Sequence, residues 1–184
     1  HGTNVWSCIA GNVNGKQTRL ATGAEFLLAK TEVNKEPFRE EVWWLAAAEW
    51  AHKNGADIIN SSLGYTRDRY FTWDMDGKTS FVTRAANMAA SKGILVVNAA
   101  GNEGSDDWHT IGAPADADSV LSIGGIDPDL GYHIDFSSYG PTADKRMKPN
   151  VSAYGKVIVS NEGGFSQSQG TSFASPLVAG FAAC

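Results

Sequence analysis

The chain has 184 residues, enough for one domain with a sizeable core. Its hydrophobic content of 42% and charged content of 19% are ordinary for a globular protein and exclude wholesale disorder. The net charge is -5 without a dense Lys/Arg run, and no apolar stretch reaches about 18 residues. We therefore expect neither a nucleic-acid surface nor a membrane span.

The first predicted elements are a strand over residues 24–30, a helix over residues 40–54 and a second strand over residues 57–62. Two glutamates suit the first turn of this helix, and Gly55 suits its end. The side chains that share its predicted core face are Trp43, Ala46, Ala47, Trp50 and Ala51. Trp44 lies outside that face and is expected to be exposed, or to meet a part of the protein outside these residues or another domain.

The cycle then repeats along the chain. A second helical face is formed by Val82, Ala85, Ala86, Ala89 and Ala90 and ends at Gly93. A continuous apolar strand follows over residues 94–100, with shorter strand candidates at 119–123 and 156–160. This alternation predicts one α/β domain with a parallel sheet. In such sheets the functional residues usually lie in loops beyond the carboxyl ends of the strands.

The segment GTSFASP places Ser172 at the start of a predicted helix. A serine needs an adjacent base to act as a nucleophile, and the free N–H groups of a helix N-terminus can stabilise an oxyanion. A serine that merely caps the helix is the alternative.

Two other segments can serve the same chemistry. His1 is one of four histidines and opens the apolar helical segment HGTNVWSCIAG, so its ring can serve as the base. Asn102 follows a buried strand in AAGNEG, where its carboxamide can donate to an oxyanion, although asparagine is also common in turns. Each motif alone is weak, but the order HGT, SLG, AAGNEG, GTSFASP is highly specific.

Together these motifs resemble those of the subtilisin-like serine proteases, the subtilases. HGTNV resembles the catalytic-histidine motif, NSSLG the strand that binds the substrate backbone, AAGNEG the oxyanion-asparagine motif and GTSFASPLVAG the nucleophile motif. The resemblance covers essentially the whole chain and implies a subtilisin-like, three-layer α/β/α fold with a mostly parallel sheet. Departures from the family pattern at Asn4, Tyr65, Asn98 and Leu177 indicate a divergent bacterial branch.

The resemblance also implies a serine endopeptidase that cleaves polypeptides through an acyl-enzyme. Ser172 would be the nucleophile, His1 the general base and Asn102 an oxyanion donor beside the Ser172 N–H. The residues implied in binding peptide are Ser62, Leu63 and Gly64 as an added strand, with residues 32–34 on the other side, and Ala99, Ala100 and Gly101 as the wall of a side-chain pocket.

The family's triad runs Asp, His, Ser along the chain. Because the histidine here is residue 1, we expect residues 1–184 to be a partial catalytic domain without the Asp-bearing N-terminal part and the C-terminal end. The nearest candidate substitutes are Asp57, Asp106, Asp107 and Asp135, and none stands where the family places its acid. We therefore expect this stretch alone to be nearly inactive and its parent to be active.

Two other functions compete with this interpretation. A catalytically inactive pseudoprotease or peptide-binding module could use the same cleft, but it would not need His1, Asn102 and Ser172 together. A non-proteolytic ligand-binding α/β protein is disfavoured because GNVNGKQT fails as a phosphate loop.

No cofactor is expected to be required and no metal site is predicted. The family allows structural calcium, but Asp74 and Asp76 ahead of Gly77 offer too few ligands for a calcium loop, so a solvated turn is favoured. Cys8 and Cys184 are expected to be small buried hydrophobes rather than a disulfide. The expected partner is a polypeptide substrate, and the expected state is a monomer, with room for flanking domains in the full-length protein. By resemblance the protein would be secreted or periplasmic, although no signal peptide lies in the chain.

Overall fold

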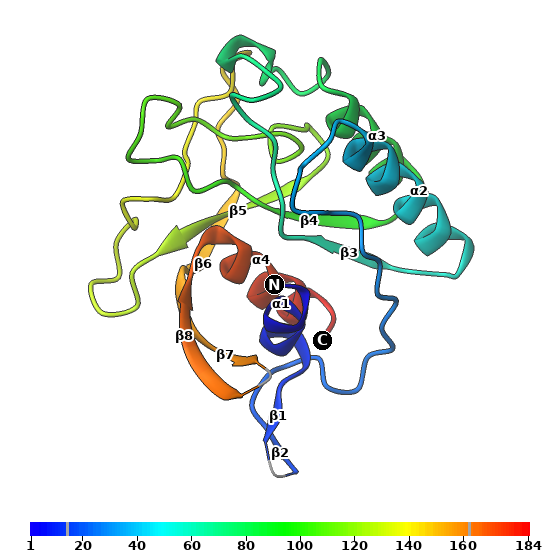
Figure 1. The fold of residues 1–184 in the computed structure, drawn as a ribbon, viewed down its shortest axis with the longest axis vertical. Helices are drawn as coiled ribbons and strands as arrows, with labels where there is room; N and C mark the ends of the chain where they lie inside the picture. Colours follow the sequence, from blue (N-terminus) through cyan, green and yellow to red (C-terminus); the bar gives the residue numbers. More distant parts are fainter. Residues whose placement is uncertain (14, 162) are drawn as a thin grey trace.

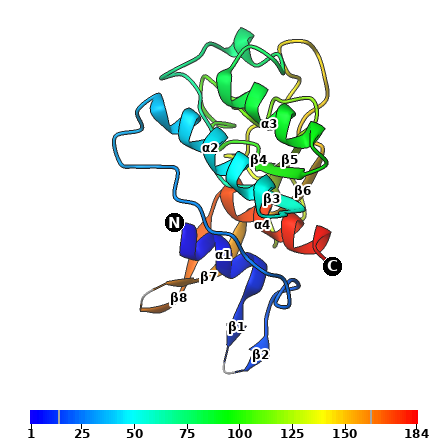
Figure 2. The ribbon, with the colours of Figure 1, turned by 90° about the vertical axis from the view of Figure 1, so that its right-hand side faces the viewer.

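A computed structural model describes residues 1–13, 15–161 and 163–184 of the chain. Three layers stack on one another, with a sheet between two pairs of helices (Figures 1 and 2). Helices α2 and α3 cover one face of the sheet, and α4 covers the other with α1 packed against it. This arrangement confirms the predicted three-layer α/β class.

The central sheet has four strands, all parallel, in the order β3-β4-β5-β6. These strands are β3 (Ile58–Ser61), β4 (Leu95–Ala99), β5 (Leu121–Ile126) and β6 (Val151–Tyr154). After its exposed first residue β4 is buried throughout, because it has a strand on each side and helices over both faces. The strands predicted over 57–62, 94–100 and 119–123 are therefore present, and β6 was not predicted.

The remaining elements frame this sheet. They are α1 (Gly2–Ala10), β1 (Asn12–Val13), β2 (Lys16–Gln17), α2 (Arg39–Lys53), the short 3-10 helix η1 (Thr72–Asp74), α3 (Phe81–Ser91), β7 (Lys156–Asn161), β8 (Gly164–Gln169) and α4 (Thr171–Ala182). Strands β7 and β8 pair as an antiparallel hairpin, so the strand predicted at 156–160 exists and lies outside the parallel sheet.

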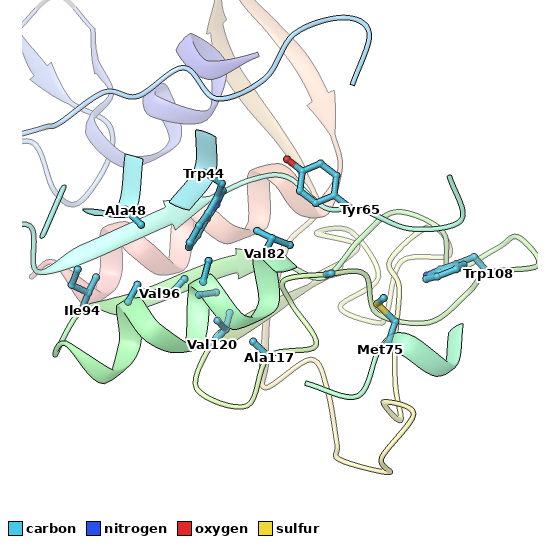
Figure 3. Packing of buried hydrophobic residues seen from close by; sticks show 14 residues of the cluster. Trp44, Ala48, Tyr65, Met75, Val82, Ile94, Val96, Trp108, Ala117 and Val120 are labelled. Carbon is cyan, nitrogen blue, oxygen red and sulfur yellow. The ribbon is translucent and has the colours of Figure 1, made fainter. Parts of the chain in front are cut away.

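The main core lies between the sheet and the helices α2 and α3 (Figure 3). Helix α3 presents the predicted face, with Val82, Ala85, Ala86 and Ala89 buried. Ser80 caps this helix by accepting a hydrogen bond from the Thr83 N–H at 3.1 Å.

Helix α2 forms where it was predicted, but it buries a different face. Trp44 and Ala48 are buried, whereas Ala46 is exposed and Trp50 is 42% exposed. Of the predicted face only Ala51 is buried. The predicted Trp43 face was wrong because the helix carries apolar residues on more than one side, so periodicity alone does not decide which side meets the sheet.

Two specific contacts select the observed face of α2. The Trp44 Nε1–H donates to Ser61 Oγ at 3.0 Å, which gives the buried indole a partner on β3. Glu40 and Glu41, on the first turn of the same helix, are fully buried and pair with Arg69. The sequence predicted correctly that these glutamates lie in the first turn of the helix, but it did not predict that they are buried.

The strand predicted over residues 24–30 is absent. This segment has no regular secondary structure and pairs with no strand in the part of the chain that the structure describes. Leu27 and Leu28 are 42% and 65% exposed. An apolar run has strand character only when a neighbouring strand takes up its N–H and C=O groups, and the sequence pattern cannot report that neighbour.

Both cysteines are free. Cys8 is buried as expected, and burial raises the pKa of its thiol, which keeps it neutral. Cys184 is exposed at the end of α4, so the expectation that both cysteines are buried was wrong for this one. Separately, none of the described helices has the length and apolar character needed to cross a bilayer.

Asp116 is a fully buried carboxylate that joins three segments of the fold. It accepts hydrogen bonds from the Gly77 N–H at 2.9 Å and the Thr83 hydroxyl at 2.5 Å, and its own N–H donates to the Gly112 carbonyl. Burial raises the pKa of Asp116 to about 6. Ionisation of the Asp116 carboxyl therefore destabilises the folded state.

We expect Asp116→Asn to change how stability depends on pH. A raised native pKa means that the native state binds the proton more tightly, so this group stabilises the fold below pH ~4 and loses that contribution as pH rises through about 6. The loss should reach about 3 kcal/mol. Urea unfolding between pH 4 and 7 should show the wild type losing stability relative to Asp116→Asn. Parallel curves for the two proteins would contradict the assignment.

Candidate active site

Ser172 lies in the first turn of α4, just after a glycine whose backbone few other residues could adopt. Gly170 has φ +141° and donates its N–H to the Gly155 carbonyl at 2.9 Å, which fixes where the helix begins. Ser172 is half-buried. The first-turn N–H groups of a helix lack the usual partners one turn earlier. Here the Thr171 N–H donates to Asn102 Oδ1 and the Phe173 N–H to the Gly170 carbonyl, which leaves the Ser172 N–H as the donor beside the Ser172 hydroxyl.

His1 lies at the start of the neighbouring helix. It precedes α1, its carbonyl accepts the Val5 N–H at 3.0 Å, and its ring centroid is 5.8 Å from that of Phe173. Helices α1 and α4 lie side by side in both views (Figures 1 and 2) and share a core of Val5, Cys8, Val159 and Phe173. His1 and Ser172 therefore begin two helices that are packed together.

Asn102 reaches the same helix start from the sheet. It follows β4 through Gly101, and its Oδ1 accepts the Thr171 N–H at 2.8 Å. The Thr171 hydroxyl lies 3.1 Å from the same oxygen and accepts the Gly101 N–H at 3.2 Å. Because Oδ1 is held as an acceptor, the orientation of the carboxamide is fixed and its Nδ2 donors are turned away from Thr171.

The turn that carries Asn102 is itself fixed by a carboxylate. Glu103 accepts the Asn102 N–H at 2.7 Å and the Ser138 hydroxyl at 3.0 Å. Gly101 has φ +117°, and a Cβ there would lie 2.6 Å from Glu103 Oε2. Only glycine fits this turn, which explains the glycine before Asn102.

The residues predicted to bind the peptide backbone are tied to α4. Ser62 donates to the Ser172 carbonyl at 2.8 Å, and Asn60 Nδ2 donates to Ser62 Oγ at 3.1 Å. Ser175 on α4 donates to Asn60 Oδ1 at 2.8 Å. Gly64 is exposed, so its backbone is open to a ligand.

The predicted pocket wall lies at the end of β4. Ala99 is 4% exposed and Ala100 is fully buried against Ile111 and Ala115. The Ala100 carbonyl accepts the Gly112 N–H at 3.2 Å. The side chains of this segment therefore point into the protein, so any contribution of Ala99 and Ala100 to a pocket would come from their backbone.

The candidate acids do not gather around His1. Asp106 forms an ion pair with Arg67 at 2.7 Å, and Asp57 precedes β3 at the opposite end from Ser62. Asp107 and Asp135 are exposed. Within residues 1–13, 15–161 and 163–184, no carboxylate forms an ion pair with His1.

Sequence reasoning missed two side chains that organise this site. Thr171 anchors Asn102, and Asn98 Nδ2 donates to the Leu63 carbonyl at 3.0 Å while remaining fully buried. The sequence treats Thr171 as part of a motif and Asn98 only as a departure from a pattern. Neither contact has a local signal, because the partners are 69 and 35 residues apart in the chain.

The described residues contain no group of three or more His, Cys, Asp or Glu side chains placed to hold a metal ion. At the turn considered for calcium, Asp76 accepts the Lys78 and Thr79 N–H groups at 3.0 and 2.8 Å. Asp74 accepts the Phe71 N–H at 2.9 Å. These carboxylates serve the turn itself, and the expectation about calcium stays a prediction.

The model of the subtilase family, Peptidase_S8, matches residues 1–184. The chain belongs to the subtilase family. Subtilisin DY of Bacillus licheniformis is 41% identical over 140 residues, which cover 76% of this chain and 46% of that protein. Subtilisin of Bacillus pumilus is 33% identical over 184 residues, which cover 100% of this chain and 62% of that protein.

Solved structures place the fold within the same family. The prenylagaramide maturation protease PagA superposes with a TM-score of 0.80 at 29% identity, covering 100% of this chain and 62% of that one. The patellamide maturation protease PatA gives a TM-score of 0.80 at 28% identity, covering 100% of this chain and 63% of that one. The subtilisin-like fold is thus confirmed. The chain spans about half to two thirds of the length of these subtilases.

Proposed function

We propose that the protein containing this chain is a serine endopeptidase with Ser172 as nucleophile. One observation carries the proposal: the first turn of α4 brings Ser172 together with the helix that begins at His1 and with a carboxamide anchored through Thr171. A nucleophile, a base and an oxyanion donor are the groups that acyl transfer needs in one place.

In the proposed mechanism, the Ser172 hydroxyl attacks the scissile carbonyl while the His1 imidazole takes up its proton. Asn102 Nδ2 and the Ser172 N–H donate to the developing oxyanion. His1 then returns the proton to the leaving amine, and water hydrolyses the acyl-enzyme by the same steps in reverse. The exposure of His1 and Asn102 and the partial exposure of Ser172 support access for a polypeptide.

The substrate backbone is proposed to pair with Ser62–Leu63–Gly64 as an added strand, with residues 32–34 along its other side. The hydrogen bond from Ser62 to the Ser172 carbonyl supports this, because it ties the pairing segment to the nucleophile's own turn. We propose that Ala99, Ala100 and Gly101 flank the side chain before the scissile bond through their backbone.

The carboxylate that orients His1 is proposed to come from a segment outside residues 1–184. A triad without its acid loses about 10⁴-fold in turnover, because the imidazole is then held in neither the correct tautomer nor the correct orientation. The 184 residues alone should therefore react slowly, and a pseudoprotease is the competing function if the longer protein is also inert.

A fluorophosphonate probe tests this assignment. We expect rapid labelling of Ser172 in a form that extends upstream through the family's aspartate strand, and weak or no labelling of residues 1–184 alone. Mass spectrometry of tryptic peptides locates the adduct. A folded extended form that shows no adduct would reject the enzyme and leave a peptide-binding pseudoprotease.

The location is proposed to be outside the cytoplasm, either secreted or periplasmic. Support comes from the resemblance to the subtilases alone. Fractionation of cells that express the natural gene would test it, because recovery in the cytoplasm would contradict the proposal.

A further inference from the structure

Arg69 joins two segments that the proposed function assigns to opposite sides of a bound peptide. It belongs to the loop that follows Gly64, and its side chain is only 10% exposed. Its Nη2 donates to the Glu36 carbonyl at 2.8 Å, the Pro37 carbonyl at 3.2 Å and Glu40 Oε2 at 3.0 Å. One guanidinium therefore crosses from the loop after residues 62–64 to the segment that leads into α2.

Glu40 extends this link to residues 32–34, which form one rim of the proposed peptide-binding cleft. While its Oε2 pairs with Arg69, its Oε1 accepts the Val33 N–H at 2.7 Å. Val33 is the central residue of the 32–34 segment. A fully buried carboxylate thus ties the backbone of the mostly exposed 32–34 segment to Arg69.

Glu41 fastens the same cluster to the core. Its Oε1 lies 3.3 Å from Arg69 Nη1, and its Oε2 accepts the Tyr70 hydroxyl at 2.7 Å and the Val82 N–H at 3.0 Å. Val82 belongs to α3, in the main hydrophobic core. The Arg69 cluster is therefore fixed to the rigid part of the domain.

The other end of the link is Tyr65, the residue directly after the proposed strand-pairing segment. The Arg69 guanidinium carbon lies 3.8 Å from the centre of the Tyr65 ring, close enough for a cation–π contact. Tyr65 is 3% exposed and exchanges two backbone hydrogen bonds with Ala113, at 2.8 and 3.1 Å. Figure 3 shows its ring within the same hydrophobic cluster as Trp44 and Val82.

We propose that Arg69 is a positioning residue that fixes the separation between residues 32–34 and residues 62–64, and so favours extended polypeptides over small esters. This inference rests on the proposed function of that cleft. Arg69 touches no substrate in this arrangement and acts through Glu40 and Tyr65. A lysine cannot replace it, because it lacks the planar fork that serves two carboxylates, two carbonyls and an aromatic face at once.

The test compares two substrates in the full-length parent protein. Arg69→Lys should lower kcat/KM for a peptide of eight or more residues by about 10-fold or more, mainly through KM, since it removes interactions worth at least one good hydrogen bond. Turnover of p-nitrophenyl acetate and labelling by a fluorophosphonate should change less than about twofold, because neither small molecule reaches the rims.

Arg67→Lys is the matched control. It lies on the same loop, but its ion pair with Asp106 is about half-exposed and should contribute little. If Arg69→Lys does not fold, Glu40→Gln serves with the same expectations, since it leaves Glu41 to pair with Arg69. Equal losses on peptide and ester, or no loss on either, would overturn the role of Arg69.

Peptide binding separates this inference from the proposed function. In a Ser172→Ala background, isothermal titration should show Arg69→Lys weakening the binding of the same peptide by about 10-fold, whether or not the parent is an active enzyme. Unchanged affinity would overturn the inference. A parent that neither turns over nor binds the peptide would reject the proposed function and the inference with it.

Discussion

Replacing Ser172 and His1 by alanine, singly and together, is expected to reduce turnover by about 10⁶-fold in all three variants of the full-length protein. This size is carried over from subtilisin, a member of the same family. In the proposed mechanism Ser172 is nucleophilic only while His1 accepts its proton, so removing either group should remove the function of both. The packing of α1 against α4 supports this coupling, because it holds the two helix starts that carry His1 and Ser172 side by side.

The measurement is kcat on an extended peptide, with unfolding curves to show that each variant is folded. Ser91→Ala and His52→Ala are matched controls, because both side chains are exposed on helices α3 and α2, across the sheet from α4. They should retain the parent's kcat. Additive losses in the double variant would mean that Ser172 and His1 act separately, which contradicts the proposed mechanism.

The sequence predicts more of the candidate site than of the packing of the core. The three motifs lie at local features that a sequence displays, namely two helix starts and a turn after a buried strand. Gly170 and Gly101 mark backbone angles that only glycine adopts readily, so the sequence signals these turns directly.

The face of α2 could not be predicted for the opposite reason. A helix with three tryptophans and several alanines offers more than one apolar stripe, and the choice depends on a distant residue, Arg69, that makes Glu40 and Glu41 compatible with burial. Charged side chains enter an interior only when they are paired, and a sequence does not show the pairing. The same limitation explains the wrong prediction of a strand at 24–30. A strand there would need a neighbouring strand to pair with, and the sequence does not show whether one is present.

These long-range contacts also explain how the site is assembled. Thr171 connects the start of α4 to the loop after β4, Ser62 connects it to the end of β3, and Phe173 connects it to α1. The carboxyl ends of parallel strands meet at one edge of a sheet, and here that edge meets a helix N-terminus. The side chains proposed to carry the chemistry therefore come from four separate segments, and each segment is joined to the start of α4 by hydrogen bonds or packing.

Replacing Asn102 should separate the anchoring role of its oxygen from the donating role of its nitrogen. Asn102→Ala is expected to lower kcat by about 10²–10³-fold with little change in KM, the loss known for the equivalent donor in subtilisin. Asn102→Asp keeps an oxygen for the Thr171 N–H but replaces the donor with a negative charge. Its kcat should fall at least as far, because a carboxylate repels the oxyanion.

Thr171→Val is the graded control for this prediction. It removes a hydroxyl that lies 3.1 Å from both Asn102 Oδ1 and the Gly101 carbonyl, and it keeps the Thr171 N–H that donates to Asn102 Oδ1 at 2.8 Å. The carboxamide therefore stays anchored through the backbone. Loss of one such hydrogen bond corresponds to about 1 kcal/mol, or roughly a fivefold lower kcat. If Asn102→Asp retained the parent's kcat, or if Asn102→Ala acted through KM alone, the donor would not be meeting charge that develops in the transition state. The carboxamide would then be a structural cap on α4.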